Sequence, residues 1–90
     1  MQINNYQKKI LLEILYNRVK DEQHIINKLK QTIVHNENWA MPIAKNMENH
    51  RIVKGMNEVI RDAKKDIESN EKDLEQIQDL INKIKDLVVN

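Results

Sequence analysis

Histidine side chains are the first place to look for chemistry in this chain, because its 90 residues include no cysteine. The three histidines are His24, His35 and His50. If His24 and His35 share a helix, they lie ~16 Å apart along its axis, which is too far to bind one metal ion. No Glu-x-x-His or His-Glu-x-x-His spacing occurs. We therefore expect surface histidines and no metal site.

Nucleophilic and phosphate-binding groups are equally scarce. Ser69 is the only serine, and Gly55, the only glycine, cannot form a Gly-rich phosphate loop by itself. The acidic residues of the second half, from Glu58 to Asp79, have the pattern of a solvated helix face, with Glu68 and Asp79 each four residues before a lysine. We expect no catalytic residue, no cofactor and no enzymatic activity.

The second half of the chain carries the clearest structural signal, a run of residues spaced alternately by three and four. The run is Val53, Met56, Ile60, Ala63, Ile67, Asn70, Leu74, Ile77, Ile81, Ile84 and Val88. A heptad repeat held this long keeps its apolar seam facing another helix. The spacing predicts one helix over about residues 55–88, with a helical partner.

The first half carries a matching seam and predicts a helix over about residues 4–35. Its members are Leu12, Leu15, Val19, Glu22, Ile26, Leu29 and Ile33. Each seam has one polar member, Glu22 in the first and Asn70 in the second. If the two share a layer, they set the register of the pairing, as a buried Asn does in coiled coils. The alternative is that one or both lie at an exposed edge.

Residues 36–54 contain the only tryptophan, the only proline and several asparagines, so we expect a turn or a short helix beginning near Pro42. Trp39, Met41 and Ile43 give this segment an apolar character. These side chains are expected to anchor the turn, with Trp39 as a plug that closes the hairpin. The other interpretation is that Trp39 anchors a partner protein.

Two seams joined by a turn predict an all-α fold, a single long antiparallel helical hairpin that resembles a coiled coil. Charge agrees with this pairing: residues 1–36 carry six basic and three acidic side chains, net +3, whereas residues 56–90 carry six basic and nine acidic, net −3. The chain is too short to build a large core, so we expect stabilisation by association, for example as a four-helix bundle.

Apolar residues outside the seams gather at the open end of the predicted hairpin and predict a partner-binding surface. They are Ile3, Tyr6, Ile10, Leu11 and Ile14 in the first helix and Leu80 and Leu87 in the second. Excess apolar surface gathered in one place usually marks an interface. The expected partner is a helical protein or a second copy of this chain.

The remaining composition excludes other classes of function. The net charge is +1 and acidic residues are mixed among the lysines of the first helix, so these lysines are expected to form a solvated surface and not a nucleic-acid-binding site. No apolar run approaches the ~20 residues that span a bilayer, and the N-terminus lacks a signal-peptide core. A cytoplasmic protein is expected, with export independent of a signal peptide still open.

The length, the two predicted helices and the single tryptophan in their connection resemble the small WXG-type hairpins of type VII secretion and the helical partners of LXG effectors. The resemblance implies export-linked heterodimers in which one hairpin packs on another. Trp39-Ala40-Met41 stands where the family has Trp-x-Gly, and the family's C-terminal Tyr-x-x-x-Asp/Glu signal is missing. The chain departs from the family in both motifs.

Two functional hypotheses follow. The first is a protein-interaction module that packs on a helical partner, such as a small partner or targeting protein linked to type VII secretion. The second is a homodimeric regulator or inhibitor from a phage or mobile element that binds a host protein. Both use the open-end surface, and they differ in what covers it.

Overall fold

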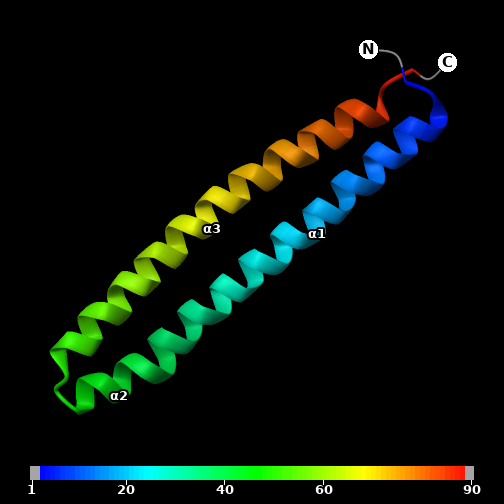
Figure 1. Ribbon diagram of the computed structural model, residues 1–90. Helices are drawn as coiled ribbons and strands as arrows, with labels where there is room; N and C mark the ends of the chain where they lie inside the picture. The colour runs from blue at the N-terminus through cyan, green and yellow to red at the C-terminus, as the bar shows by residue number, and fades with distance from the viewer. Residues whose placement is uncertain (1–2, 89–90) are drawn as a thin grey trace.

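The computed structural model describes residues 3–88 and shows two long helices lying side by side in opposite directions (Figure 1). Helix α1 spans Asn5–His35 and α3 spans His50–Lys85. Between them lie a π-helical segment, η1, over Asn36–Ala40 and the short helix α2 over Met41–Asn46. The Cα atoms extend over 68 × 15 × 13 Å. The predicted all-α hairpin is confirmed.

Asparagine side chains start both long helices. The backbone N–H of Gln7 donates to Asn4 Oδ1 at 2.8 Å, and the N–H of Asn4 donates to Gln7 Oε1 at 3.1 Å, which forms a capping box. Asn49 accepts from the N–H of Ile52 at 3.2 Å and begins α3. Each cap satisfies N–H groups that the first helical turn leaves unpaired.

The predicted turn covers residues 36–54, but the chain reverses its direction only in the later part of this range and over fewer residues. It stays helical through η1 and α2, reverses at residues 47–49, and is helical again from His50. Pro42 lies in the first turn of α2, where its missing N–H removes no needed hydrogen bond. The N–H of Met41 donates to Asn36 O, an i to i+5 bond that closes the π turn just before the proline. This arrangement accommodates Pro42 without ending the helical path.

Glu48 and Gly55 differ in their backbone roles: Glu48 takes part in the reversal, whereas Gly55 lies inside a helix. Glu48 has φ of 53°, the left-handed conformation that turns the chain toward α3. Gly55, by contrast, lies inside α3, and a Cβ atom added to it would meet nothing within 4 Å. The expectation that α3 begins at Gly55 is therefore wrong by five residues.

The hydrophobic core coincides with the two predicted seams. The buried seam residues are Ile26 of α1 and Ile60, Ala63, Ile77, Ile81 and Ile84 of α3. Most other seam residues are half-buried, and Val88 is exposed because α3 ends at Lys85. None of the large side chains described is fully buried. Two helices alone thus form a thin core, which leaves their outer faces in contact with solvent.

Candidate protein-binding surface

The structure separates the predicted partner-binding residues into two groups. Ile3 is buried and belongs to the core, so its placement on the partner-binding surface is not supported. It precedes α1, which begins at the open end of the hairpin beside the C-terminal end of α3 (Figure 1). Leu11 is half-buried. Tyr6, Ile10, Ile14, Leu80 and Leu87 are exposed, with Ile14 at 58% and Leu80 at 46%.

Residues seven apart form a stripe along one side of α3. The stripe contains Ile52, Val59, Asp66, Asp73 and Leu80, and Leu87 follows at the same spacing beyond the helix end. All six are exposed. Seven residues are close to two full helical turns, so these side chains lie on one flank of the seam.

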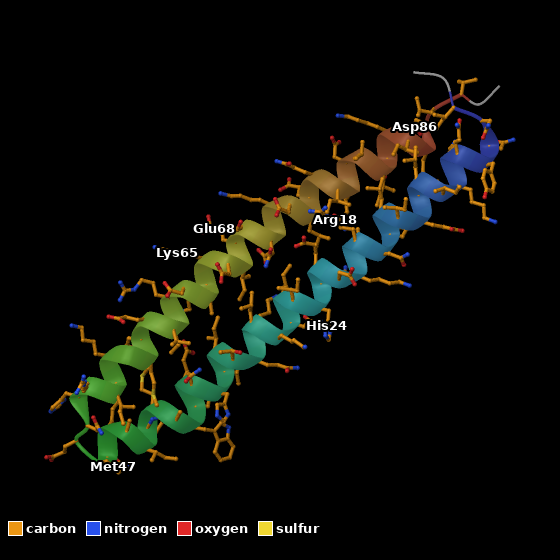
Figure 2. The ribbon with its side chains drawn as sticks, viewed as in Figure 1. Arg18, His24, Met47, Lys65, Glu68 and Asp86 are labelled. Carbon is orange, nitrogen blue, oxygen red and sulfur yellow. The ribbon has the colours of Figure 1, made fainter. Side chains whose placement is uncertain are left out.

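A corresponding stripe runs along α1 through Leu11, Arg18 and Ile25, again seven residues apart. Arg18 lines a shallow hollow with Asp73, Ile77 and Leu80. Figure 2 shows Arg18 between the two helices, whereas His24 points away from α3. The stripes of α1 and α3 therefore belong to the same side of the hairpin.

We name this side the apolar face and define it by the exposed and half-buried apolar residues of the two stripes and their neighbour Ile14. They are Leu11, Ile14 and Ile25 of α1 and Ile52, Val59 and Leu80 of α3. Ile14 lies one turn before Arg18 on the helix surface. Tyr6 and Ile10 continue from Ile14 at spacings of four along the outer edge of α1. Leu87 extends the face at the open end.

Ile25, Ile52 and Val59 are apolar-face residues that sequence reasoning missed. Ile52 lies within the predicted turn over residues 36–54, so its spacings of 7 to Val59 and 28 to Leu80 do not count as a helical pattern there. Ile25 precedes the seam residue Ile26 and was not considered beside it. The signal is present in the sequence as multiples of seven: Ile25 follows Leu11 by 14 residues, and Val59 and Ile52 precede Leu80 by 21 and 28 residues.

The opposite side of the hairpin, the polar face, is solvated. On α3 it presents an exposed row of polar residues: Asn57, Arg61, Lys64, Glu68, Glu71, Glu75, Gln78, Asn82 and Lys85. Two contacts join it to the other arm of the hairpin: Lys64 Nζ lies 3.7 Å from Glu37 Oε1 of η1, and Lys85 Nζ lies 5.5 Å from the centre of the Tyr16 ring of α1. On α3 the two sides of the hairpin therefore differ in chemistry, whereas α1 places the 40%-exposed ring of Tyr16 on the polar side.

Ion pairs on the outer surface of α3 follow the predicted spacing. Lys72 Nζ is 3.6 Å from Glu68 Oε1, and Lys83 Nζ is 3.0 Å from Asp79 Oδ2. All four side chains are exposed, so each pair contributes only a few tenths of a kcal/mol, about 0.3 to 0.5. The prediction of a solvated acidic helix face is confirmed.

Trp39 does not close the hairpin. Its side chain is 67% exposed and lines a shallow hollow with Lys30, Val34 and His35 on the outer surface of α1. The predicted plug is wrong, because the reversal lies eight residues further along and leaves Trp39 in the middle of a helical path. Met41 is half-buried and lies near Ile60, whereas Ile43 is exposed. Of the three predicted turn anchors, only Met41 faces α3.

Glu22 and Asn70, the predicted register residues, are both half-buried in their seams. The side chain of Glu22 is 12% exposed, and Arg18 Nη2 lies 4.0 Å from its Oε1. Within residues 3–88, Glu22 Oε2 is the one buried side-chain polar atom that has no hydrogen-bond partner. An unpaired buried oxygen destabilises the seam at this layer. That Glu22 and Asn70 together set the register of the two helices stays a prediction.

Two further kinds of functional feature, metal sites and membrane-spanning helices, were sought in the described part of the chain. Across residues 3–88, no group of three or more His, Asp or Glu side chains is arranged to hold a metal ion. Over the same residues, no helix has the length and apolar character needed to cross a membrane.

The apolar face is thus the feature of the described chain that most needs a functional explanation. Comparisons with known proteins do not supply one. No protein-family model, curated protein or solved structure matches the chain.

Proposed function

We propose that this chain is a non-enzymatic protein-interaction module whose apolar face packs on helices of another polypeptide. The observation that carries the proposal is the gathering of Ile14, Ile25, Ile52, Val59 and Leu80 on one side of a hairpin whose other side is lined on α3 by polar residues. Single exposed apolar residues are ordinary on protein surfaces, but apolar residues that recur at helical spacing along the same side of two helices are characteristic of an interface.

The shape of the surface favours a helical partner. The row runs along the length of a 68 Å hairpin, and its members recur at helical spacing on both helices. Such a surface suits helices laid along it, because their side chains fill the spaces between residues four and seven apart. Complete burial of an Ile or Leu side chain contributes about 1.5 to 3 kcal/mol, and these half-exposed residues would contribute part of that.

The resemblance to type VII secretion hairpins suggests a finer hypothesis, in which the partner is an exported helical protein and the chain leaves the cytoplasm with it. The two-helix architecture supports this hypothesis, and the missing Trp-x-Gly motif counts against it. The broader proposal of a protein-interaction module does not depend on it.

Site-specific photocrosslinking in the native host tests the proposal. A photoreactive phenylalanine analogue is placed at Ile14 or Leu80 on the apolar face, and at Glu71 or Gln78 on the polar face as matched controls. We expect protein adducts from Ile14 and Leu80 and none from the controls. Absence of adducts at both apolar positions, or equal adducts from both faces, would contradict the proposal.

A further inference from the structure

We infer that the polypeptide covering the apolar face is a second copy of this chain, stacked face to face so that α1 of each copy lies on α3 of the other. This inference rests on the proposed function, since it names the occupant of the same surface. Three observations support the inference: the charges on the apolar face, the levels of its residues, meaning their positions along the length of the hairpin, and the extent of the face.

Charged residues interrupt the apolar face at the middle of each helix, and their signs differ. On α3 the stripe carries Asp66 and Asp73, with Asp62 on its outer edge. On α1 the stripe carries Arg18, and Lys28 and Asp21 lie on its outer edge. The middle of the face is therefore acidic on α3, whereas on α1 the two basic residues are matched by Asp21 and by Glu22, which lies 4.0 Å from Arg18.

Two aligned hairpins stacked face to face can be related by a twofold axis along their length or across it. An axis across the length places α3 on α3, with Asp66 of one copy opposite Asp73 of the other. An axis along the length places α1 on α3 twice, with basic residues opposite acidic ones. Because like charges at a contact oppose association, the charges select the axis along the length.

The levels of the residues agree with this arrangement. Lys8 of α1 reaches the carbonyl oxygens of Lys85 and Leu87, Arg18 adjoins Asp73 and Leu80, and Glu37 pairs with Lys64. These contacts place Leu11 and Ile14 of α1 at the level of Leu80 in α3. An axis along the length keeps these levels unchanged.

In the dimer, apolar residues consequently meet at the open end and opposite charges meet in the middle, where Ile25 lies between the levels of Asp66 and Asp73. Leu11 and Ile14 of one copy lie at the level of Leu80 of the second copy, at the open end. Arg18 lies near the level of Asp73 of the second copy, and Lys28 near that of Asp66. Every contact occurs twice, as an isologous interface requires.

The extent of the face also suits a second copy. The Cα extents of 68 and 15 Å let a second copy lie along the whole hairpin, and a standard stable interface needs ~800 Å² of buried accessible surface per partner. A second copy would complete a four-helix bundle around the exposed apolar residues of both chains. It would also cover the thin core that two helices leave incomplete.

Distance measurement between spin labels tests the arrangement, and the chain suits it because it contains no native cysteine. Lys9→Cys places one label per copy near the open end, on an exposed position. With the axis along the length, the two labels should lie about 20 to 30 Å apart, two helix layers plus the label arms. With the axis across the length they should lie about 50 Å apart, at ~1.5 Å per residue.

Asn27→Cys is the matched control, because it lies near the middle of the hairpin and gives a short distance in both arrangements. A short distance for both variants is the expected result. A short distance for Asn27→Cys with a long one for Lys9→Cys would overturn the proposed axis. Monomers at tens of micromolar, with no coupling for either label, would overturn the dimer.

Charge reversal gives an independent readout. A copy carrying Asp66→Lys and Asp73→Lys, and another carrying Arg18→Glu and Lys28→Glu, should each self-associate about tenfold more weakly or worse. Mixing the two copies should restore dimers, since each altered helix then faces an opposite charge. Circular dichroism of each copy checks that the hairpin remains folded. Failure of the mixture to associate better than either folded copy alone would contradict the inference.

The outcomes separate this inference from the proposed function. A monomeric chain whose Ile14 and Leu80 positions crosslink to another protein leaves the interaction module intact and removes the second copy. If the chain is monomeric and gives no adducts from the apolar face, both the second copy and the interaction module are ruled out.

Discussion

The ammonium group of Lys8, near the start of α1, donates hydrogen bonds to the carbonyl oxygens of Lys85 at 2.8 Å and Leu87 at 3.2 Å, where α3 ends. The last carbonyls of a helix have no partner within it and carry the negative end of its dipole. Lys8 therefore caps the second helix from the first and fixes the two ends of the hairpin together.

Lys8→Met should weaken this cap while keeping the length of the side chain. We expect a loss of about 0.5 to 1.5 kcal/mol in the free energy of unfolding, the value of a partly exposed hydrogen bond to a charged group. Urea denaturation followed by circular dichroism measures the loss. Lys9→Met is the matched control, because Lys9 is exposed and no hydrogen bond or ion pair of its side chain is described. Equal stability of the two variants would argue against the cap.

Trp39→Ala should leave the hairpin nearly as stable as the parent chain. The indole is 67% exposed, so its removal leaves no cavity, and we expect a loss below about 1 kcal/mol. A buried plug would instead cost about 3 to 5 kcal/mol. Thermal unfolding distinguishes these values, with Ile60→Ala as a control for a core position. A loss near that of the control would show that Trp39 is buried in solution.

Gly55→Ala should stabilise the chain. Gly55 lies within α3, its φ is not positive, and an added Cβ would meet nothing within 4 Å. Alanine is preferred over glycine in a helix interior by about 0.5 to 1 kcal/mol. The midpoint of urea unfolding should rise accordingly. No change, or a decrease, would indicate that the helix is distorted at this position.

Glu48→Gly should also stabilise the chain, although glycine is usually unfavourable elsewhere. Glu48 has φ of 53°, a conformation that is strained for residues with a Cβ atom and free of strain for glycine. We expect a gain of about 0.5 to 1 kcal/mol after the larger unfolded-state entropy of glycine is subtracted. Glu48→Val should be destabilising in the same assay, since a β-branched side chain increases the strain. The reverse order would contradict the left-handed turn.

Seam residues such as Ile60, Ile77 and Ile84 were predictable because heptad spacing is a local property of the sequence. The position of the reversal could not be predicted in this way. Pro42 and its neighbouring asparagines have the composition of a turn, yet the π turn at Asn36–Ala40 accommodates the proline within a continuing helical path. The misplaced reversal removed the first turn of α3 from the predicted helix, and with it Ile52, one of the six residues that define the apolar face. Errors in element boundaries thus became errors in the candidate site.

Glu22 provides the sharpest test of the packing between the helices. Its Oε2 is buried without a hydrogen-bond partner, so Glu22→Leu should stabilise the hairpin by about 1 kcal/mol, with loss of an unsatisfied polar atom and gain of apolar contact. Asn70→Leu in α3, alone and combined with Glu22→Leu, completes a double-mutant cycle measured by urea unfolding. If the two residues share a layer, the combined gain should differ from the sum of the single gains by more than about 0.5 kcal/mol, because residues in contact are not additive. An additive result would place them in separate layers, so that the register depends on the apolar seams and on the Lys8 cap.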